Sequence, residues 1–148
     1  RDTDRSRGLG DVYKRQLRLR AARATQGSPY MLQLIGYNIG NRCKTGEHVT
    51  PEQVDGAIEA SKADFENDVC ETTLAALSDQ DVAFLDAMTD DEDAVSRISD
   101  VAKRMSVTPD YAQKYRRRLI DAGVIEQARR GYVRFAVPYM ADYLRSQL

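Results

Sequence analysis

The residues best placed to do chemistry lie between positions 109 and 122, a stretch that reads as a helix. Its apolar positions recur at spacings of three, four and three residues, and they form the expected core stripe: Ala112, Tyr115, Leu119 and Ala122. At about 100° per residue, the opposite face is polar, and it carries Gln113, Lys114 and Arg117 between Asp110 and Asp121, with Arg116 and Arg118 beside it. Arg and Lys can bond to guanine, Gln can bond to adenine, and all three can reach phosphate. This face therefore predicts contact with the major groove of DNA.

A second basic element follows directly along the chain. Residues 124–128 and 132–137 read as two strands, and the glycine between them, Gly131, predicts a hairpin. A basic hairpin tip can reach the DNA backbone or the minor groove, and the two tyrosines near these elements can add hydrogen bonds to phosphate. The predicted DNA-contact residues are Tyr111, Gln113, Lys114, Arg116, Arg117, Arg118, Arg129, Arg130, Tyr132 and Arg134.

Two other interpretations of this basic surface stay open. A fold of this kind also serves as a platform for protein contacts, including packing on a parent domain, and Arg-rich helix faces are often only solvated. We prefer DNA contact because two separate elements contribute to one positive surface.

No other constellation in the sequence indicates catalysis or metal binding. The one histidine, His48, has no second ligand nearby, and Cys43 and Cys70 lie far apart, as expected of packing residues. The acidic run 90–93 lacks the spacing and the glycine of a calcium loop, so we interpret it as a solvated loop. No GxxxxGK[ST] motif is present, so we expect neither catalytic residues, a metal nor a bound cofactor in this chain.

The charges are segregated, although the net charge of the 148 residues is only −1. Residues 1–46 hold ten Lys and Arg against three acidic residues, and residues 101–134 hold nine against three. Residues 47–93 hold fifteen acidic residues and one lysine. Such blocks suggest two lobes of different electrostatic character, and a solvated surface is the simplest interpretation of the acidic block.

Composition and local signals define the elements that must position these residues. With 42% hydrophobic and 30% charged residues the chain is globular, and no window is apolar enough for a membrane helix, so we expect a cytoplasmic protein. Residues 1–16 lack helical periodicity and predict a disordered or non-native tail. A short helix over 17–24 ends at Gly27, Ser28 and Pro29 open a second helix, and residues 50–53 form a capping box that starts a third helix reaching about position 72.

The C-terminal half predicts a winged helix-turn-helix. Ser78 and Thr108 begin helices, residues 98–105 form another, and the hairpin and a last helix over 139–146 complete the order. The predicted fold is mainly α: a small helical bundle over 17–73, a boundary near 73–78, and a winged helix over 74–148 with a two-stranded β wing. In the second helix we expect Leu32, Ile35 and Ile39 on the buried side, with Met31 and Leu34 beside them.

Residues 27–37, with the sequence GSPYMLQLIGY, resemble a segment in the lid of certain bacterial and archaeal AAA+/STAND-type ATPases. Residues 78–148 are similar to the C-terminal winged helix of the same proteins, most closely at 118–125 (RLIDAGVI) and 131–138 (GYVRFAVP). The resemblance implies that Gly27 and Pro29 lie near a nucleotide, ATP with Mg²⁺, bound by the parent protein. Without the resemblance, the same two residues simply punctuate helices.

The ATPase core of that family is missing from this sequence. The resemblance therefore implies a C-terminal fragment of an ATP-binding switch protein, in which the nucleotide state of the missing core controls DNA binding by the winged helix. Partners would be DNA and the missing core in cis, with no membrane, and an exposed lid surface would let the fragment self-associate. The alternatives are a protein-interaction or autoinhibitory module and a free-standing winged-helix transcription regulator.

Overall fold

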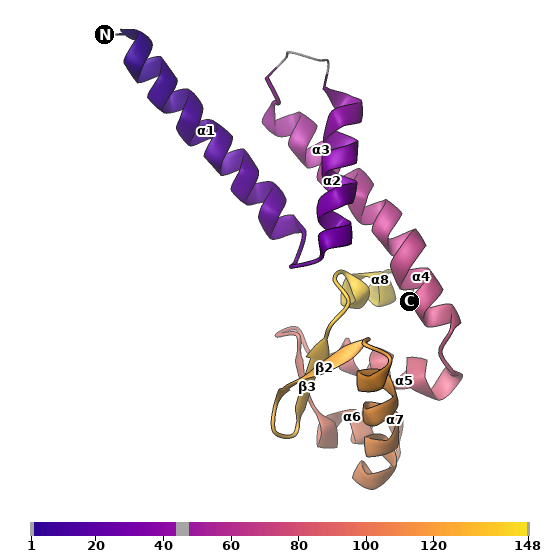
Figure 1. The fold of residues 1–148 in the computed structure, drawn as a ribbon. Coiled ribbons are helices and arrows are strands. Elements are labelled where there is room, and N and C mark those ends of the chain that lie inside the picture. Colours follow the sequence, from indigo (N-terminus) through magenta and orange to yellow (C-terminus); the bar gives the residue numbers. More distant parts are fainter. Residues whose placement is uncertain (1, 44–47, 148) are drawn as a thin grey trace. The chain divides into compact units, whose positions relative to one another are not determined.

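A computed structural model describes residues 2–43 and 48–147 of the chain. The chain is mainly helical and includes one small antiparallel sheet, as expected (Figure 1). It divides into two compact units, Arg1–Phe65 and Glu66–Leu148, which we call unit 1 and unit 2. The division lies before the predicted boundary at 73–78, because the segment after Phe65 packs with the C-terminal elements.

Unit 1 consists of three helices: α1 (Asp2–Ala24), α2 (Pro29–Arg42) and α3 (Pro51–Phe65). Helices α2 and α3 pack closely, and their shared core includes Met31, Ile35, Val54, Ala57 and Phe65. Burial of these side chains stabilises the unit by about 25 cal/mol for each Å² of apolar surface removed from water.

A polar contact also lies inside unit 1. The buried Asn38 side chain donates hydrogen bonds to the Ser61 hydroxyl at 2.9 Å and to the Leu34 carbonyl at 3.0 Å. Ser61 in turn donates to the Ala57 carbonyl at 2.6 Å. These bonds satisfy groups that would be costly to bury unpaired.

Two expectations for unit 1 differ from the structure. Residues 2–16 form the first part of α1 rather than a disordered tail, and the side chains over 12–16 are exposed. In α2, Leu32 is 57% exposed and Ile39 is half-buried, whereas Asn38 is buried. The stripe is rotated toward Asn38 because Ser61 offers it a partner.

The predicted helix starts are confirmed by their capping bonds. The hydroxyls of Ser28, Thr50, Ser78 and Thr108 each accept a hydrogen bond at 3.2 Å from the backbone N–H three residues later. Thr50 and Gln53 complete the expected capping box, since the backbone N–H of Thr50 donates to the Gln53 side chain at 2.9 Å.

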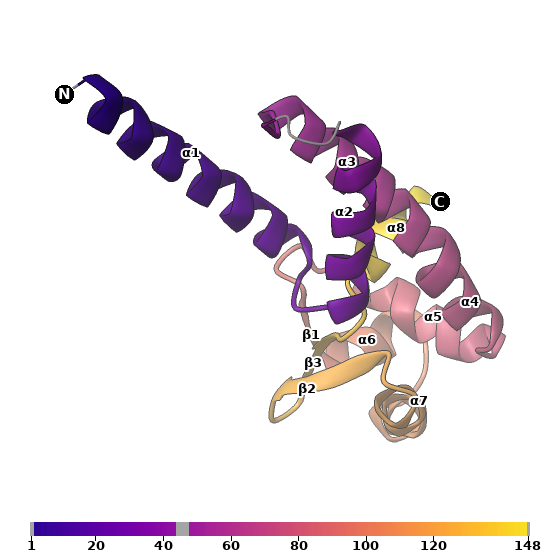
Figure 2. The same ribbon diagram turned by 45° about the horizontal axis from the view of Figure 1, so that its top comes forward.

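Unit 2 begins with a π-helical segment and contains all three strands. Its elements are η1 (Glu66–Cys70), α4 (Glu71–Ala75), α5 (Asp79–Met88), β1 (Val95–Arg97), α6 (Ile98–Met105), α7 (Pro109–Asp121), β2 (Ile125–Arg129), β3 (Tyr132–Phe135) and α8 (Met140–Ser146). Helices α5, α6 and α7 pack on one another, and Figure 2 shows the strands beside them, with the β2–β3 hairpin projecting away.

The sheet has the order β1-β3-β2, and both pairs are antiparallel. The β2–β3 hairpin confirms the prediction, with a bulge between Gln127 and Arg129 and a turn in which Gly131 has φ of 80°. The sequence missed β1, so the predicted two-stranded wing is the larger part of a three-stranded sheet. Three residues are too few for a readable alternation, and β1 exists because Ser96 pairs with Val133 of β3.

The core of unit 2 lies between the three helices and one face of the sheet. Its fully buried side chains include Phe84 and Leu85 of α5, Val101 of α6, Leu119 of α7 and Val133 of β3. Ala112, Tyr115 and Leu119 are buried as predicted, but Ala122 is exposed because α7 ends there and Ala122 forms its C-cap. Across the described residues, no helix combines the length and apolar character needed to cross a membrane.

Candidate nucleic-acid interface

Helix α7 turns its basic side to solvent because its other side is buried. The Thr108 cap and Pro109 fix where the helix begins, and Ala112, Tyr115 and Leu119 face the core. Lys114 and Arg117 are exposed on the outer side, and Gln113 beside them is half-buried. Among the described residues, no acidic side chain pairs with Lys114 or Arg117. These two cations can therefore approach an anion without breaking an existing ion pair.

Arg118 lies on the same helix but forms an ion pair with an acidic residue of α5. Its Nε donates to Asp81 Oδ1 at 3.2 Å and its Nη2 donates to Asp81 Oδ2 at 3.0 Å. Asp81 is only 1% exposed, and it also accepts hydrogen bonds from the backbone and hydroxyl of Ser78. Burial alone would raise the pKa of Asp81, but the bonds from Arg118 and Ser78 outweigh it and lower the pKa. Arg118 is therefore a bridge between α7 and α5.

Two further predicted contact residues already bond to neighbours. Arg116 donates to the Gln127 side chain at 3.1 Å and thereby links α7 to β2. On the hairpin, Arg134 pairs with Glu126 at 2.6 Å, and both side chains are about half exposed. These bonds lie at the surface, so they can be exchanged for phosphate contacts at small cost.

The hairpin end carries the other predicted cations. Arg129 and Arg130 are exposed, and the Arg129 guanidinium carbon lies 4.0 Å from the centre of the half-buried Tyr132 ring. This stacking is a cation–π contact, which holds the guanidinium over the sheet. Arg130 has no ion pair among the described residues.

Near the start of α7, two tyrosines form a pair. The hydroxyls of Tyr111 and Tyr115 lie 3.1 Å apart, and Tyr111 is 44% exposed. The hydrogen bond with Tyr111 raises the pKa of Tyr115. Lys114 Nζ lies 5.7 Å from the centre of the Tyr115 ring. The aromatic pair therefore gives Tyr111 and Lys114 a fixed support at this end of the helix.

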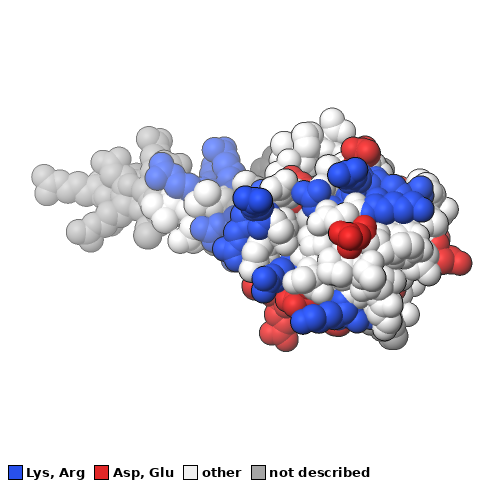
Figure 3. Space-filling view, turned by 90° about the horizontal axis from the view of Figure 1, so that it is seen from below, with Lys and Arg blue, Asp and Glu red and all other residues white. Residues whose placement is uncertain are grey.

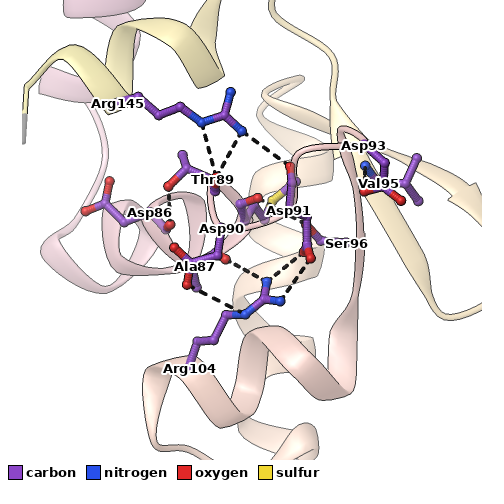
Figure 4. Close-up of polar contacts among 11 residues, drawn as sticks. Asp86, Ala87, Thr89, Asp90, Asp91, Asp93, Val95, Ser96, Arg104 and Arg145 are labelled. Carbon is purple, nitrogen blue, oxygen red and sulfur yellow. Dashed lines mark hydrogen bonds and ion pairs between the residues drawn. The ribbon is translucent and has the colours of Figure 1, made fainter.

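In the acidic loop between α5 and β1, Asp90, Glu92 and Asp93 are exposed, as expected of a solvated loop, but Asp91 is half-buried and bound. Arg104 of α6 donates to both carboxylate oxygens of Asp91, at 2.6 and 2.9 Å, and to the Ala87 carbonyl at 2.9 Å (Figure 4). Arg145 of α8 donates to the Thr89 carbonyl at 2.9 and 3.2 Å. The bonds from Arg104 lower the pKa of Asp91. The loop is thus clamped by two arginines, and Asp91 is kept from the basic side of α7.

One face of the structure shows how these charges are spread. In Figure 3, Lys and Arg side chains gather in several groups with neutral surface between them, and a carboxylate lies among the groups.

Sequence reasoning missed Arg97 at the end of β1. Arg97 is exposed and pairs in register with Tyr132 of β3, so it belongs to the same sheet end as Arg129. The sequence carries no readable signal for Arg97, because β1 has only three residues and its pairing with β3 is what places Arg97 on the sheet.

Gly27 and Pro29 lie at the junction of α1 and α2. Gly27 has φ of 78°, and its N–H donates to the Thr25 hydroxyl at 3.3 Å; Pro29 is the first residue of α2. Both residues are accounted for by their places at helix ends, because Gly27 forms the turn after α1 and Pro29 begins α2. Their proximity to a nucleotide stays a prediction from the resemblance.

The remaining candidates offer no reactive site. Among the described residues, no group of three or more His, Cys, Asp and Glu side chains could hold a metal ion. Cys43 is half-buried and Cys70 is fully buried, where burial, and then Glu66, raise the pKa of the Cys70 thiol to about 12. A thiol with this pKa is protonated at neutral pH and is a poor nucleophile.

A family model described as a domain of unknown function (DUF8462) matches residues 67–144. No curated protein and no solved structure gives a significant match to the chain. The matched residues coincide closely with unit 2, which holds α7 and the hairpin.

Proposed function

Because the chain belongs to the DUF8462 family through residues 67–144, and because this part carries an open basic helix face, we propose that unit 2 is a winged helix that binds DNA. The order α5-β1-α6-α7-β2-β3 and the sheet order β1-β3-β2 support the winged-helix assignment. In that assignment α7 is the recognition helix and the β2–β3 hairpin is the wing.

One observation carries the proposal. Lys114 and Arg117 are exposed on the side of α7 that faces away from the core, and neither forms an ion pair among the described residues. Asp110 and Asp121 lie on the same face, whereas Asp81 is paired with Arg118 and Asp91 with Arg104. With Gln113 the two cations offer groups able to bond to base edges, and Arg129 and Arg130 can bond to phosphates at the hairpin. The net charge of −1 makes this segregation necessary, since the chain as a whole does not attract a polyanion.

The experiment is a titration of the full chain on a labelled DNA duplex longer than two helical turns, at several salt concentrations. The log of the affinity should fall with log salt by roughly 0.9 for each phosphate contacted. Lys114→Gln/Arg117→Gln should weaken binding at least tenfold, on an estimate of about 1 kcal/mol or more for each contact. The matched control, Lys14→Gln/Arg18→Gln, removes two exposed cations of α1 and should leave binding nearly unchanged.

Two results would overturn this proposal. One is an absence of binding at low salt, and the other is an equal loss in the α7 variant and in the control. An equal loss would mean that the affinity for DNA depends only on the net charge of the chain.

The wider proposal is that this module is controlled by ATP in a missing ATPase core. It is supported by the resemblance of residues 27–37 and 78–148 to the AAA+/STAND-type ATPases, and the first of these segments lies outside the matched residues 67–144. A coding sequence with a Walker A motif upstream of position 1 would support it, and a different upstream domain would contradict it.

A second candidate function is a protein-interaction or autoinhibitory module. Tyr111, 44% exposed at the start of α7, favours it, because exposed aromatic side chains are typical of protein interfaces. Under this hypothesis Tyr111→Ala would abolish partner binding, and the salt dependence of DNA binding would be absent or shallow.

A further inference from the structure

The end of the sheet brings three side chains into one row across its strands. Arg97 of β1 pairs with Tyr132 of β3, and Tyr132 pairs with Arg129 of β2. Directly paired residues of antiparallel strands lie on the same face of a sheet, so the three side chains are neighbours. The Ile98 N–H donates to the Gly131 carbonyl at 3.0 Å, which holds the end of β1 against the hairpin turn.

This row lies on the solvent side of the sheet. Ser96 and Val133, which alternate with Arg97 and Tyr132 along their strands, are buried on the opposite side. Arg97 and Arg129 are exposed, and Tyr132 is half-buried between them.

Ion pairing within this face leaves two of its arginines without an acidic partner. The acidic residue among its paired positions on β2 is Glu126, and its carboxylate is bound to Arg134 at 2.6 Å. Within the described part of the chain, Arg97 and Arg129 have no acidic partner. The row therefore holds two arginines without an acidic partner, one on each side of Tyr132 in the strand register.

We infer that the row Arg97–Tyr132–Arg129 binds a phosphate group of the DNA backbone, and that Arg97 supplies a contact which the hairpin alone lacks. This inference rests on the proposed function of unit 2. The two N–H groups of a guanidinium match the geometry of phosphate oxygens. Because Arg129 stacks on Tyr132, its guanidinium is already oriented before a phosphate binds. The Tyr132 ring is covered by Arg129, so the row favours phosphate binding over stacking of a base.

A phosphate contact positions the protein on DNA without reading sequence. The effect of removing Arg97 should therefore be the same on unrelated duplexes, unlike the effect of removing Gln113 or Arg117 on α7. This difference separates the row from the base-contacting face.

The test compares the full chain with Arg97→Gln and Arg97→Lys on two duplexes of different sequence, over a range of salt concentrations. Arg97→Gln should weaken both complexes by a similar factor of about three to ten, and the slope of log affinity against log salt should decrease by about 0.9. Arg97→Lys, which keeps the charge but not the fork, should restore the salt slope and part of the affinity. Lys14→Gln is the control for loss of one exposed charge, and thermal unfolding verifies that each variant is folded.

The outcomes separate this inference from the function on which it depends. If the full chain binds DNA and the α7 variant weakens it, but Arg97→Gln has no more effect than Lys14→Gln, the row is not a contact and only this inference fails. If Arg97→Gln changes affinity for one duplex only, Arg97 reads sequence and the phosphate assignment is wrong. If the full chain does not bind DNA at all, both proposals fail together.

Discussion

Arg118 binds both oxygens of Asp81 through two N–H groups, at 3.0 and 3.2 Å, and so joins α7 to the N-terminal turn of α5. Asp81 is almost wholly buried, whereas the Arg118 side chain is 55% exposed. The pair is thus a carboxylate held inside the protein by a cation at its surface. The geometry fixes the angle at which the basic side of α7 is presented, because the helix is anchored one residue after Arg117.

Removing either partner should destabilise unit 2 unequally. Arg118→Ala leaves a buried carboxylate with only the Ser78 bonds, and we expect a cost of about 2–3 kcal/mol. Asp81→Asn keeps the shape, leaves a solvated arginine and should cost about 1–2 kcal/mol, including the weakened cap. Urea unfolding at neutral pH measures both, and Arg117→Ala, whose side chain has no polar partner among the described residues, is the control expected near zero. A smaller cost for Arg118→Ala than for Asp81→Asn would contradict this account.

The Asp81 contribution should also depend on pH. Because folding lowers the pKa of Asp81, the stabilisation is present above the ordinary value of about 3.9 and is lost as the pH falls through the lower, folded value. The difference in unfolding free energy between the wild type and Asp81→Asn should therefore shrink below about pH 4. A difference that stays constant from pH 7 to pH 3 would show that the charge does not matter.

The clamp on the α5–β1 loop predicts a change of stability without a change of DNA binding. Arg145→Ala removes both donors to the buried Thr89 carbonyl, and we expect a loss of about 1–2 kcal/mol. The measurement pairs thermal unfolding with the DNA titration, and a large loss of DNA affinity in the folded variant would contradict the structural role.

We predict that Glu126 lowers the affinity of the protein for DNA. Glu126→Gln releases Arg134 from its ion pair and removes the negative charge from the exposed sheet face, so affinity should rise about twofold to fivefold and the salt slope should steepen. Stability should change by less than about 1 kcal/mol, because both partners are half exposed. Glu92→Gln, a loss of one exposed negative charge in the α5–β1 loop, is the control for total charge, and an equal gain there would count against a local effect.

The two cysteines should differ sharply in reactivity. Cys70 is buried, its Sγ lies 3.7 Å from the Pro138 carbonyl, and its pKa is raised to about 12, so it should resist thiol reagents in the folded protein. Cys43 is half-buried and should react first. A thiol assay at pH 8 should find one fast group per chain and a second after denaturation. Two fast groups would show that η1 opens readily.

Much of the local structure could be predicted from the sequence. The caps at Ser28 and Thr108 and the glycine turn at Gly131 depend on neighbours a few residues away, and the structure has them as expected. Predictions that needed more distant partners fared worse. Leu32 was expected inside and is exposed, and Asp91 of the acidic loop was expected to be solvated but binds Arg104. Both outcomes involve a residue of another helix, because Asn38 of α2 is buried beside Ser61 of α3 and Arg104 belongs to α6.

The sequence by itself determined where helices begin, which side of α7 is polar and that a basic hairpin follows, because periodicity and capping are short-range properties. Only the tertiary structure decided which arginines are held in ion pairs and which can bind a ligand. Asp81 and Arg118 are 37 positions apart, and the β1 register beside Tyr132 exists only because β1 pairs with β3. A side chain's availability depends on the groups that packing brings against it, and those contacts are not encoded in the spacing of residues along one helix.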